Sequence, residues 1–238
     1  MCGRYSNRYT WRELYELYRL SYGYQESDWE PKFNIAPTTQ IPVIRFVDGE
    51  RRMDLMRWGL VPSWSKEVGK FATHNARADG CETKPLYRSA WKAGRRCIVP
   101  ASSFFEWRKP DKQPFAIGMG NKGPLSIAGL WEESRIDGMP LLSATMITTD
   151  PNALMEPIHN RMPVILGDED IPAWLGEESA DTARLRKMLA PFAAERMAAW
   201  AVSSEVGNVK NQQATLADEV NPSASPEPKP TPRPRTSR

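Results

Sequence analysis

Cys2 carries the most distinctive potential chemistry in this sequence because it directly follows Met1. A small second residue normally permits removal of the initiator methionine, and the chain would then begin with an α-amine and a thiol on one residue. The α-amine has a pKa of ~7.7–8.0 against ~10.4 for lysine, so far more of it is neutral near pH 7. A neutral amine attacks a carbonyl to form a Schiff base. The thiol then closes on the imine carbon as a five-membered thiazolidine, which predicts an aldehyde as the electrophile.

Two other roles for Cys2 stay open. The thiol could attack an ester or an amide as an acyl nucleophile. Alternatively, the residue is an unremarkable small residue at position 2.

Two titratable side chains could move protons for either reaction. Glu106 lies between Phe105 and Trp107 in a predicted strand, and strand alternation places it on the same face as Phe104. Burial among rings would raise the pKa of this carboxyl and let it give and take a proton near neutral pH. His159 has an ordinary pKa near neutrality. A surface glutamate and a structural histidine are the alternatives.

Further polar and aromatic side chains indicate nucleic-acid contact. Asn75 offers both a donor and an acceptor to a sugar or a hemiaminal, unless it caps a turn. Three arginines lie close in sequence to the candidate catalytic residues, and arginine suits bidentate contact to phosphate: Arg4, Arg77 and Arg161. Tryptophans available to stack on bases are Trp58, Trp64 and Trp107. Most of the nine tryptophans must nevertheless pack in the core.

The charge balance excludes a polycationic coat for nucleic acid. The 238 residues hold 32 Lys and Arg against 29 Asp and Glu, a net charge of +3. Residues 221–238 contribute four cations and one anion, so residues 1–220 balance at 28 against 28. A DNA-binding surface must therefore be a local groove.

Several other protein classes are also excluded. No apolar run approaches the ~20 residues of a membrane span, and no secretory signal is visible. The three cysteines, Cys2, Cys81 and Cys97, form no CxxC pair, and the odd count predicts free thiols in a reducing, cytoplasmic compartment. His74 and His159 are the only histidines, and no zinc-binding spacing includes them. We expect no metal and no cofactor.

The elements that must position these residues are mostly short strands. A capping-box pattern predicts a helix over residues 10–24. Tight turns are predicted at Asp48-Gly49 and Asp137-Gly138. Strands are predicted over 41–47, 53–58, 96–100, 104–107, 114–119, 125–131, 141–148, 162–166 and 200–203, and helices over 171–175 and 181–189. This pattern indicates an α+β fold with a largely antiparallel sheet or barrel.

Seven motifs occur in an order that resembles the SOS-response-associated peptidase (SRAP) family. They are Met1-Cys2-Gly3-Arg4, Asn34-Ile35-Ala36-Pro37, the segment 58–64, Asn75-Ala76-Arg77-Ala78, Phe105-Glu106-Trp107, the segment 159–163 and the segment 206–211. The resemblance implies a single SRAP-like domain over residues 2–217, an antiparallel barrel-like sheet flanked by helices. Residues 218–238 form a proline-rich, basic tail that we expect to be disordered. Residues 80–88 follow no family pattern.

The resemblance also implies a function and roles for individual residues. Such a protein crosslinks itself to abasic sites in single-stranded DNA, near the nucleoid when DNA is damaged. Cys2 would form the thiazolidine, Asn75 would hold the sugar, Glu106 would transfer protons and His159 would assist ring opening and reversal. The residues expected to contact DNA are Arg4, Pro37, Trp64, Arg77, Trp107, Thr148 and Arg161.

Two alternative functions stay open at this stage. The same four residues could cleave an initiator peptide as a cysteine-type peptidase, by autoprocessing or on other chains. The protein could also be a non-catalytic module that binds single-stranded DNA, with Cys2 incidental.

Overall fold

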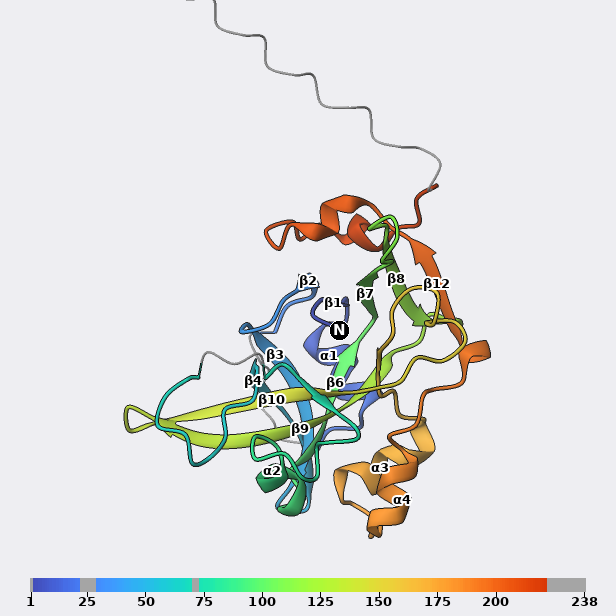
Figure 1. Ribbon diagram of the computed structural model, residues 1–238. Helices are drawn as coiled ribbons and strands as arrows, with labels where there is room; N and C mark the ends of the chain where they lie inside the picture. The colour runs from blue at the N-terminus through green and yellow to red at the C-terminus, as the bar shows by residue number, and fades with distance from the viewer. Residues whose placement is uncertain (1, 22–28, 70–72, 222–238) are drawn as a thin grey trace, which may run out of the picture.

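A computed structural model describes residues 2–21, 29–69 and 73–221 of the chain. The expected removal of Met1, the end of the predicted helix over 10–24 and nearly all of the predicted tail lie outside these described residues. Figure 1 shows the arrangement of the described elements.

Strands dominate the described part of the chain, as the sequence predicts. Their bounds are β1 Tyr5–Asn7, β2 Lys32–Ile35, β3 Gln40–Val47, β4 Glu50–Trp58, β5 Asn75–Arg77, β6 Arg96–Ala101, β7 Ser103–Trp107, β8 Pro114–Met119, β9 Leu125–Ile136, β10 Met139–Thr149, β11 Met162–Pro163 and β12 Met197–Ala201. The two predicted hairpin turns are present. Asp48 and Gly49 have φ values of 54° and 77°, and Asp137 and Gly138 have 51° and 79°. Two successive positive φ values are those of the type I′ turn that favours Asp-Gly.

Five strands close into a barrel, which confirms the predicted barrel-like sheet. The strands follow each other in the order β10, β4, β3, β6 and β9, and β9 pairs back onto β10. All of these pairs are antiparallel except β10 with β4, which is parallel. Two short strands extend this sheet beyond the barrel, because β11 and β5 both pair with β10. β5 runs parallel to β10 and carries Asn75 at its first position.

Closure of the barrel depends on a glycine in β9. Gly129 pairs with Cys97 of β6 on one side and with Met146 of β10 on the other. A Cβ atom at Gly129 would lie 2.7 Å from the carbonyl oxygen of Thr145 and 3.0 Å from the Cys97 sulfur. A residue with a side chain would therefore push the neighbouring strands apart.

The second sheet is antiparallel and follows the order β12, β8, β7, β1 and β2. Within it, β7 lies between two groups of buried apolar residues. Phe104 packs in the larger group, whereas Phe105 packs with Val202 and Val206 in the smaller one. Because both faces of β7 are covered, Glu106 is buried as well.

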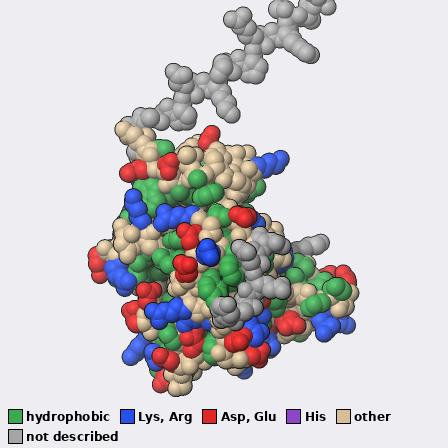
Figure 2. All heavy atoms as spheres, turned by 180° about the vertical axis from the view of Figure 1, so that it is seen from behind, with side chains coloured by type: hydrophobic (Ala, Val, Ile, Leu, Met, Phe, Trp, Pro, Cys, Tyr) green, Lys and Arg blue, Asp and Glu red, His purple; other side chains and the backbone are tan. Residues whose placement is uncertain are grey.

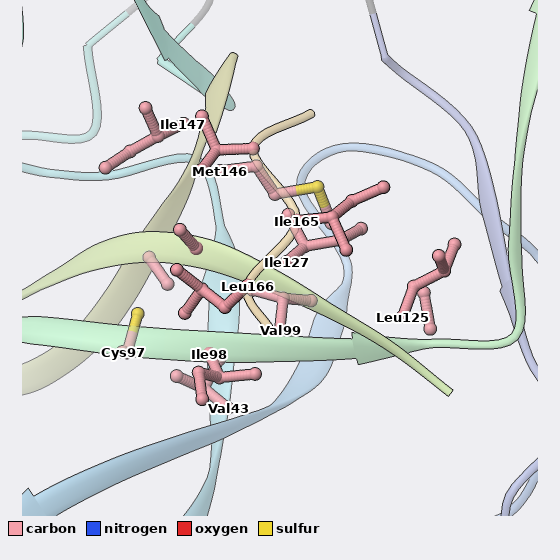
Figure 3. Packing of buried hydrophobic residues seen from close by; sticks show 14 of the residues in the cluster. Val43, Cys97, Ile98, Val99, Leu125, Ile127, Met146, Ile147, Ile165 and Leu166 are labelled. Carbon is pink, nitrogen blue, oxygen red and sulfur yellow. The ribbon is translucent and has the colours of Figure 1, made fainter. Parts of the chain in front are cut away.

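The main core fills the barrel. Figure 3 shows Val43, Val99, Ile127 and Met146, from four barrel strands, within one packed group. Each of these four residues is fully buried. Burial of one such side chain stabilises the fold by roughly 1.5–3 kcal/mol. The barrel is therefore a rigid support for the strands that carry the candidate site.

Short helices flank the sheets. They are α1 Trp11–Leu17, α2 Arg88–Lys92, α3 Ile171–Leu175 and α4 Thr182–Lys187. The capping box predicted at Thr10 and Glu13 is present. α1 ends at Leu17, however, and Arg19 has a φ of 49°, so the helix stops earlier than predicted. α3 has the predicted bounds, and α2 was not predicted. None of the described helices combines the length and the apolar character needed to cross a membrane.

Most predicted strands are present with ends that differ by one or more residues, and β4 begins at Glu50 rather than at residue 53. The strand expected over 162–166 is restricted to Met162–Pro163, and Ile165 forms only an isolated bridge with Ile127. The last strand begins at Met197 rather than at residue 200. β9 continues five residues beyond the predicted end at residue 131 because the β9–β10 hairpin pairs up to its turn.

Candidate active site

Cys2 lies in a buried position just before β1, which runs between β2 and β7 (Figure 1). Its side chain is 1% exposed. Burial raises the pKa of the thiol, and the Glu106 carboxylate raises it further, whereas the backbone N–H of Arg4 lowers it. The strand that carries Glu106 adjoins this position, because the N–H of Phe105 donates a 2.9 Å hydrogen bond to the Arg4 carbonyl oxygen. Cys81 and Cys97 are also buried and free, as expected for thiols without a partner cysteine.

Asn75 binds the backbone of Cys2. Its Nδ2 atom donates a hydrogen bond of 2.7 Å to the Cys2 carbonyl oxygen. The Asn75 backbone is itself held, because its carbonyl oxygen accepts a 3.0 Å hydrogen bond from the Tyr87 hydroxyl and β5 pairs with Met146 of β10. The Oδ1 atom of Asn75 is buried and accepts no hydrogen bond from the described residues. This oxygen is thus oriented as an acceptor beside Cys2.

Glu106 has the altered acidity that its aromatic neighbours suggested. The side chain is buried within β7, and this burial raises its pKa from 4.5 to about 7. Loss of water around a carboxylate disfavours its charged form. A carboxyl group that titrates near neutrality is suited to give and take protons.

His159 faces Glu106 with a defined ring nitrogen. The Nε2 atom of His159 lies 3.9 Å from Oε2 of Glu106, beyond direct hydrogen-bond distance. The backbone N–H of Arg161 donates a 3.1 Å hydrogen bond to Nδ1 of His159. The same Nδ1 atom lies 3.2 Å from the Arg161 carbonyl oxygen, so the backbone of Arg161 holds the ring in either tautomer. Burial lowers the pKa of His159, which favours the neutral form.

The three candidate arginines have different surroundings. Arg161 is buried, and its Nη2 atom donates to the Thr148 carbonyl at 2.5 Å and to the Thr148 hydroxyl at 2.8 Å. Its Nε atom is also buried and donates to no acceptor among the described residues. Arg77 is half-exposed and forms a bidentate pair with Asp79 at 2.9 Å and 2.6 Å. Arg77 is the register partner of Thr148 in the β5–β10 pair, so both arginines lie beside Thr148.

Arg4 is anchored to other parts of the protein. Its Nη1 atom donates to Oδ1 of Asn34 at 2.9 Å and to the Val206 carbonyl oxygen at 2.7 Å. The guanidinium group also lies over the Trp107 ring, 5.9 Å from its centroid. Arg4 therefore joins the strand that follows Cys2 to the segment around Val206.

Pro37 and Trp64 line one cavity of about 240 Å³. Trp64 is 62% exposed, which is unusual for so large an apolar side chain. His74 lines the same cavity and makes an edge contact with Trp58, whose ring is fully buried. Trp58 is thus a core residue and Trp64 a surface one, a distinction that the sequence left open.

The structure brings Cys2, Asn75, Glu106 and His159 together, and Arg161 adjoins them through the His159 ring. Two further residues were missed by the sequence reasoning. Asn34 belongs to a quoted motif but had no assigned role, and Asp79 follows Arg77 at a spacing that suits a local ion pair. Among the described residues, no three His, Cys, Asp or Glu side chains gather as they would around a metal ion.

The chain forms an α+β domain that consists of a closed barrel and a second sheet. Its candidate active site is a buried group of a cysteine, an asparagine, a glutamate and a histidine. The chain belongs to the SOS response associated peptidase (SRAP) family, which it matches over residues 1–209.

Named relatives and solved structures resemble the chain over most of its length. Abasic site processing protein YoqW of Bacillus subtilis is 37% identical over 224 residues, which cover 92% of this chain and 99% of YoqW. Abasic site processing protein HMCES of Xenopus tropicalis is 33% identical over 217 residues, 77% of this chain and 64% of HMCES. A crystal structure of a Bacteroides thetaiotaomicron protein superimposes with a TM-score of 0.80 at 27% identity, covering 92% of this chain and all of the other.

Proposed function

We propose that this protein processes abasic sites by forming a covalent crosslink between Cys2 and the damaged sugar in single-stranded DNA. The observation that carries the proposal is the buried group around Cys2. Asn75 holds the Cys2 carbonyl, and Glu106, on the strand that pairs with β1, lies 3.9 Å from His159. The names of the relatives YoqW and HMCES support abasic sites as the substrate class.

The proposed chemistry proceeds in two bond-forming steps once Met1 has been removed. The neutral α-amine of Cys2 attacks the C1′ aldehyde of the ring-opened sugar, and the resulting carbinolamine loses water to give a Schiff base. The Cys2 thiol then adds across the C=N bond: sulfur bonds to C1′ and the thiol proton ends on nitrogen. The product is a thiazolidine. If β-elimination precedes ring closure, the strand is cut, which would appear as weak lyase activity.

Glu106 and His159 supply the proton transfers in this scheme. A carboxyl group with a pKa of about 7 donates a proton to the departing hydroxyl group and recovers one from the amine. His159 places its Nε2 atom 3.9 Å from the same carboxylate and assists sugar ring opening and crosslink reversal. Asn75 offers its buried Oδ1 atom to a sugar hydroxyl.

The DNA contacts in this proposal surround the reacting residues. Arg77 and Arg161 bind phosphates, and the buried Nε–H of Arg161 is a donor that suits a phosphate oxygen. Pro37 and Trp64 pack against bases beside the lesion. The remaining residues of the proposed interface are Arg4, Trp107 and Thr148. Arg4 also binds the Val206 carbonyl oxygen, and Thr148 also binds the Arg161 side chain. Contacts of this kind do not depend on the DNA sequence. On the face seen in Figure 2, acidic and basic side chains are interspersed, and no continuous basic surface covers it.

Intact-mass measurement of the protein before and after incubation with abasic single-stranded DNA tests the proposal. We expect loss of Met1 from the purified chain and, with damaged DNA, a mass increase equal to the DNA strand minus one water. Undamaged DNA of the same sequence and a Cys2→Ala variant should give no such adduct. An adduct of equal yield in Cys2→Ala would show that the linkage forms without the thiol, through the α-amine alone or a lysine, and would contradict the proposal.

The family description favours a second candidate, a cysteine-type peptidase that uses the same residues. Both candidates use the Cys2 sulfur as the nucleophile, so the substrate distinguishes them. Cleavage of a peptide substrate without DNA, lost in Cys2→Ala, would support the peptidase. Binding of single-stranded DNA without any adduct would instead indicate a non-catalytic binding module.

A further inference from the structure

The segment that carries Trp64 lies outside the helices and strands, and its position therefore depends on specific anchors. Residues 59–64 follow β4 directly. The segment begins at Gly59, whose N–H donates to the Ala144 carbonyl oxygen at 2.8 Å, and continues at Leu60, whose N–H donates to the Thr73 carbonyl oxygen at 3.2 Å. Beyond Leu60, the anchors of this segment are side chains.

Two buried side chains hold the next part of the segment. The N–H of Val61 donates to the Ser143 hydroxyl at 2.8 Å, and the N–H of Ser63 donates to Oε2 of Glu132 at 3.2 Å. Pro62, between them, has no N–H to satisfy. Both donors therefore find acceptors immediately before Trp64.

The two acceptors form one unit on the barrel. Ser143 of β10 and Glu132 of β9 are directly opposite each other in the antiparallel ladder, so their side chains project from the same face. Both residues are fully buried. Their spacing across the strands matches two backbone donors that are two residues apart in the segment.

Burying the Glu132 carboxylate has a large desolvation penalty, which is unfavourable for a residue with only a structural role. A fully buried carboxylate loses its hydration and needs a paired charge, which Arg95 provides. Arg95 is itself one-third exposed and lies over the Trp131 ring. Replacing a buried ion pair by apolar residues is often neutral or stabilising, so the pair is weak evidence for a role in stability alone.

We propose that Glu132, together with Ser143, is a positioning residue that fixes the Trp64 segment on the barrel so that the Trp64 ring is ready to stack on a DNA base. This inference rests on the proposed function, in which Trp64 contacts DNA, and extends it to residues that touch no DNA themselves.

Hydrogen exchange of the free protein tests the positioning without DNA. We expect Glu132→Leu, which removes the acceptor, to speed exchange of the amides in residues 61–65 while the barrel strands keep wild-type protection. Glu132→Gln keeps an oxygen acceptor for Ser63 and should restore most of the protection. Glu133→Leu is the matched control, because Glu133 is the next residue on β9 and is exposed. Wild-type exchange of this segment in Glu132→Leu would overturn the proposal.

A double-mutant cycle tests the link to DNA. Binding is measured with single-stranded DNA containing an abasic analogue that lacks the C1′ hydroxyl, so that no aldehyde and no crosslink can form. We expect Trp64→Ala to weaken binding about tenfold and Glu132→Leu by about three- to tenfold, in the range of one lost base stack. If Glu132 acts through Trp64, then Glu132→Leu has little further effect when Trp64 is already alanine.

The remaining outcomes separate this inference from the proposed function. At saturating abasic DNA, Glu132→Leu should crosslink at the wild-type rate, because only binding depends on Trp64. Additive effects of the two substitutions, or a Trp64→Ala variant that binds as well as wild type, would overturn the positioning role. Absence of any adduct with the wild-type protein would instead contradict the proposed chemistry, while the exchange and binding results would still decide the role of Glu132.

Discussion

Asn75 donates a 2.7 Å hydrogen bond from Nδ2 to the carbonyl oxygen of Cys2. This bond fixes the backbone of the residue to which the crosslinking chemistry is assigned, and it leaves the buried Oδ1 atom of Asn75 without a donor among the described residues. The amide therefore has one fixed role toward the protein and one available role toward a sugar.

An Asn75→Asp variant should crosslink abasic DNA more slowly. A carboxylate is nearly the same size as the amide but has no N–H to donate, so it loses the bond to Cys2 and repels that carbonyl oxygen. A hydrogen bond contributes about 0.5–1.5 kcal/mol, which corresponds to a rate decrease of about two- to tenfold, with more from the repulsion. Single-turnover adduct formation on a denaturing gel measures the effect. Asn121→Asp is a control, because Asn121 uses only its oxygen, as an acceptor for Gly123. A wild-type rate in Asn75→Asp would remove Asn75 from the site.

A Glu106→Gln variant should crosslink more slowly, and its pH–rate profile should lose the descending limb. The wild-type rate requires a neutral amine and a protonated carboxyl with a pKa of about 7, so its pH profile should be bell-shaped. Glutamine neither donates nor accepts a proton in this range. We expect a rate lower by about a hundredfold or more, the usual contribution of general acid–base catalysis, and a profile that only rises with pH. A variant that keeps the bell shape would assign the descending limb to another group.

The same variant should be more stable than wild type at alkaline pH. The pKa of Glu106 is raised from 4.5 to about 7 in the folded protein. The contribution of this group to the free energy of unfolding is therefore most favourable while the carboxyl is protonated. Between pH 4.5 and about 7 only the folded protein holds this proton, so stability on the order of 3 kcal/mol is lost across that range and is absent above it. Glu106→Gln avoids this loss. Its Tm advantage should be clear at pH 8 and small at pH 5, and Glu133→Gln, on an exposed side chain, should show neither.

Much of the fold follows from local sequence patterns. The hairpins at Asp48-Gly49 and Asp137-Gly138 were predictable because the turn type demands those residues. The bounds of β8 and α3 were predicted to the residue. By contrast, β1, β2 and β5 have three or four residues each and gain their stability from pairing with distant strands, so no local pattern marks them.

The candidate site shows the same division. Residue type alone nominated Cys2, Glu106 and His159, because a potential terminal aminothiol, a carboxylate among rings and a rare histidine each have identifiable chemistry. Their spatial relation depends on pairing between strands that are distant in the sequence. β5 and β11 both pair with β10 of the barrel, whereas β7 pairs with β1 of the second sheet. The anchor at Glu132 could not be predicted either, since a glutamate in a strand is ordinarily exposed.

Asp79 should limit the affinity of this protein for DNA. It holds Nε and Nη2 of Arg77 in a bidentate pair at 2.9 Å and 2.6 Å, and the two side chains are 51% and 62% exposed. A phosphate can bind this edge of the guanidinium group only by displacing the carboxylate. The exposed pair contributes little to stability, about 0–1 kcal/mol. An Asp79→Asn variant removes the competitor and the repulsion that it exerts on phosphate.

We therefore expect Asp79→Asn to bind abasic-analogue single-stranded DNA a few-fold more tightly than wild type. Its logarithmic salt dependence should be steeper by up to ~0.7, the value for one added phosphate contact on a single strand. Equilibrium binding between low and moderate salt measures both quantities. Glu50→Gln is the matched control, because it removes the same kind of partner from Arg52, which has no assigned DNA contact. Unchanged or weaker binding by Asp79→Asn, with Glu50→Gln at wild type, would mean that Arg77 does not contact phosphate and that the arginine belongs only to its surface ion pair.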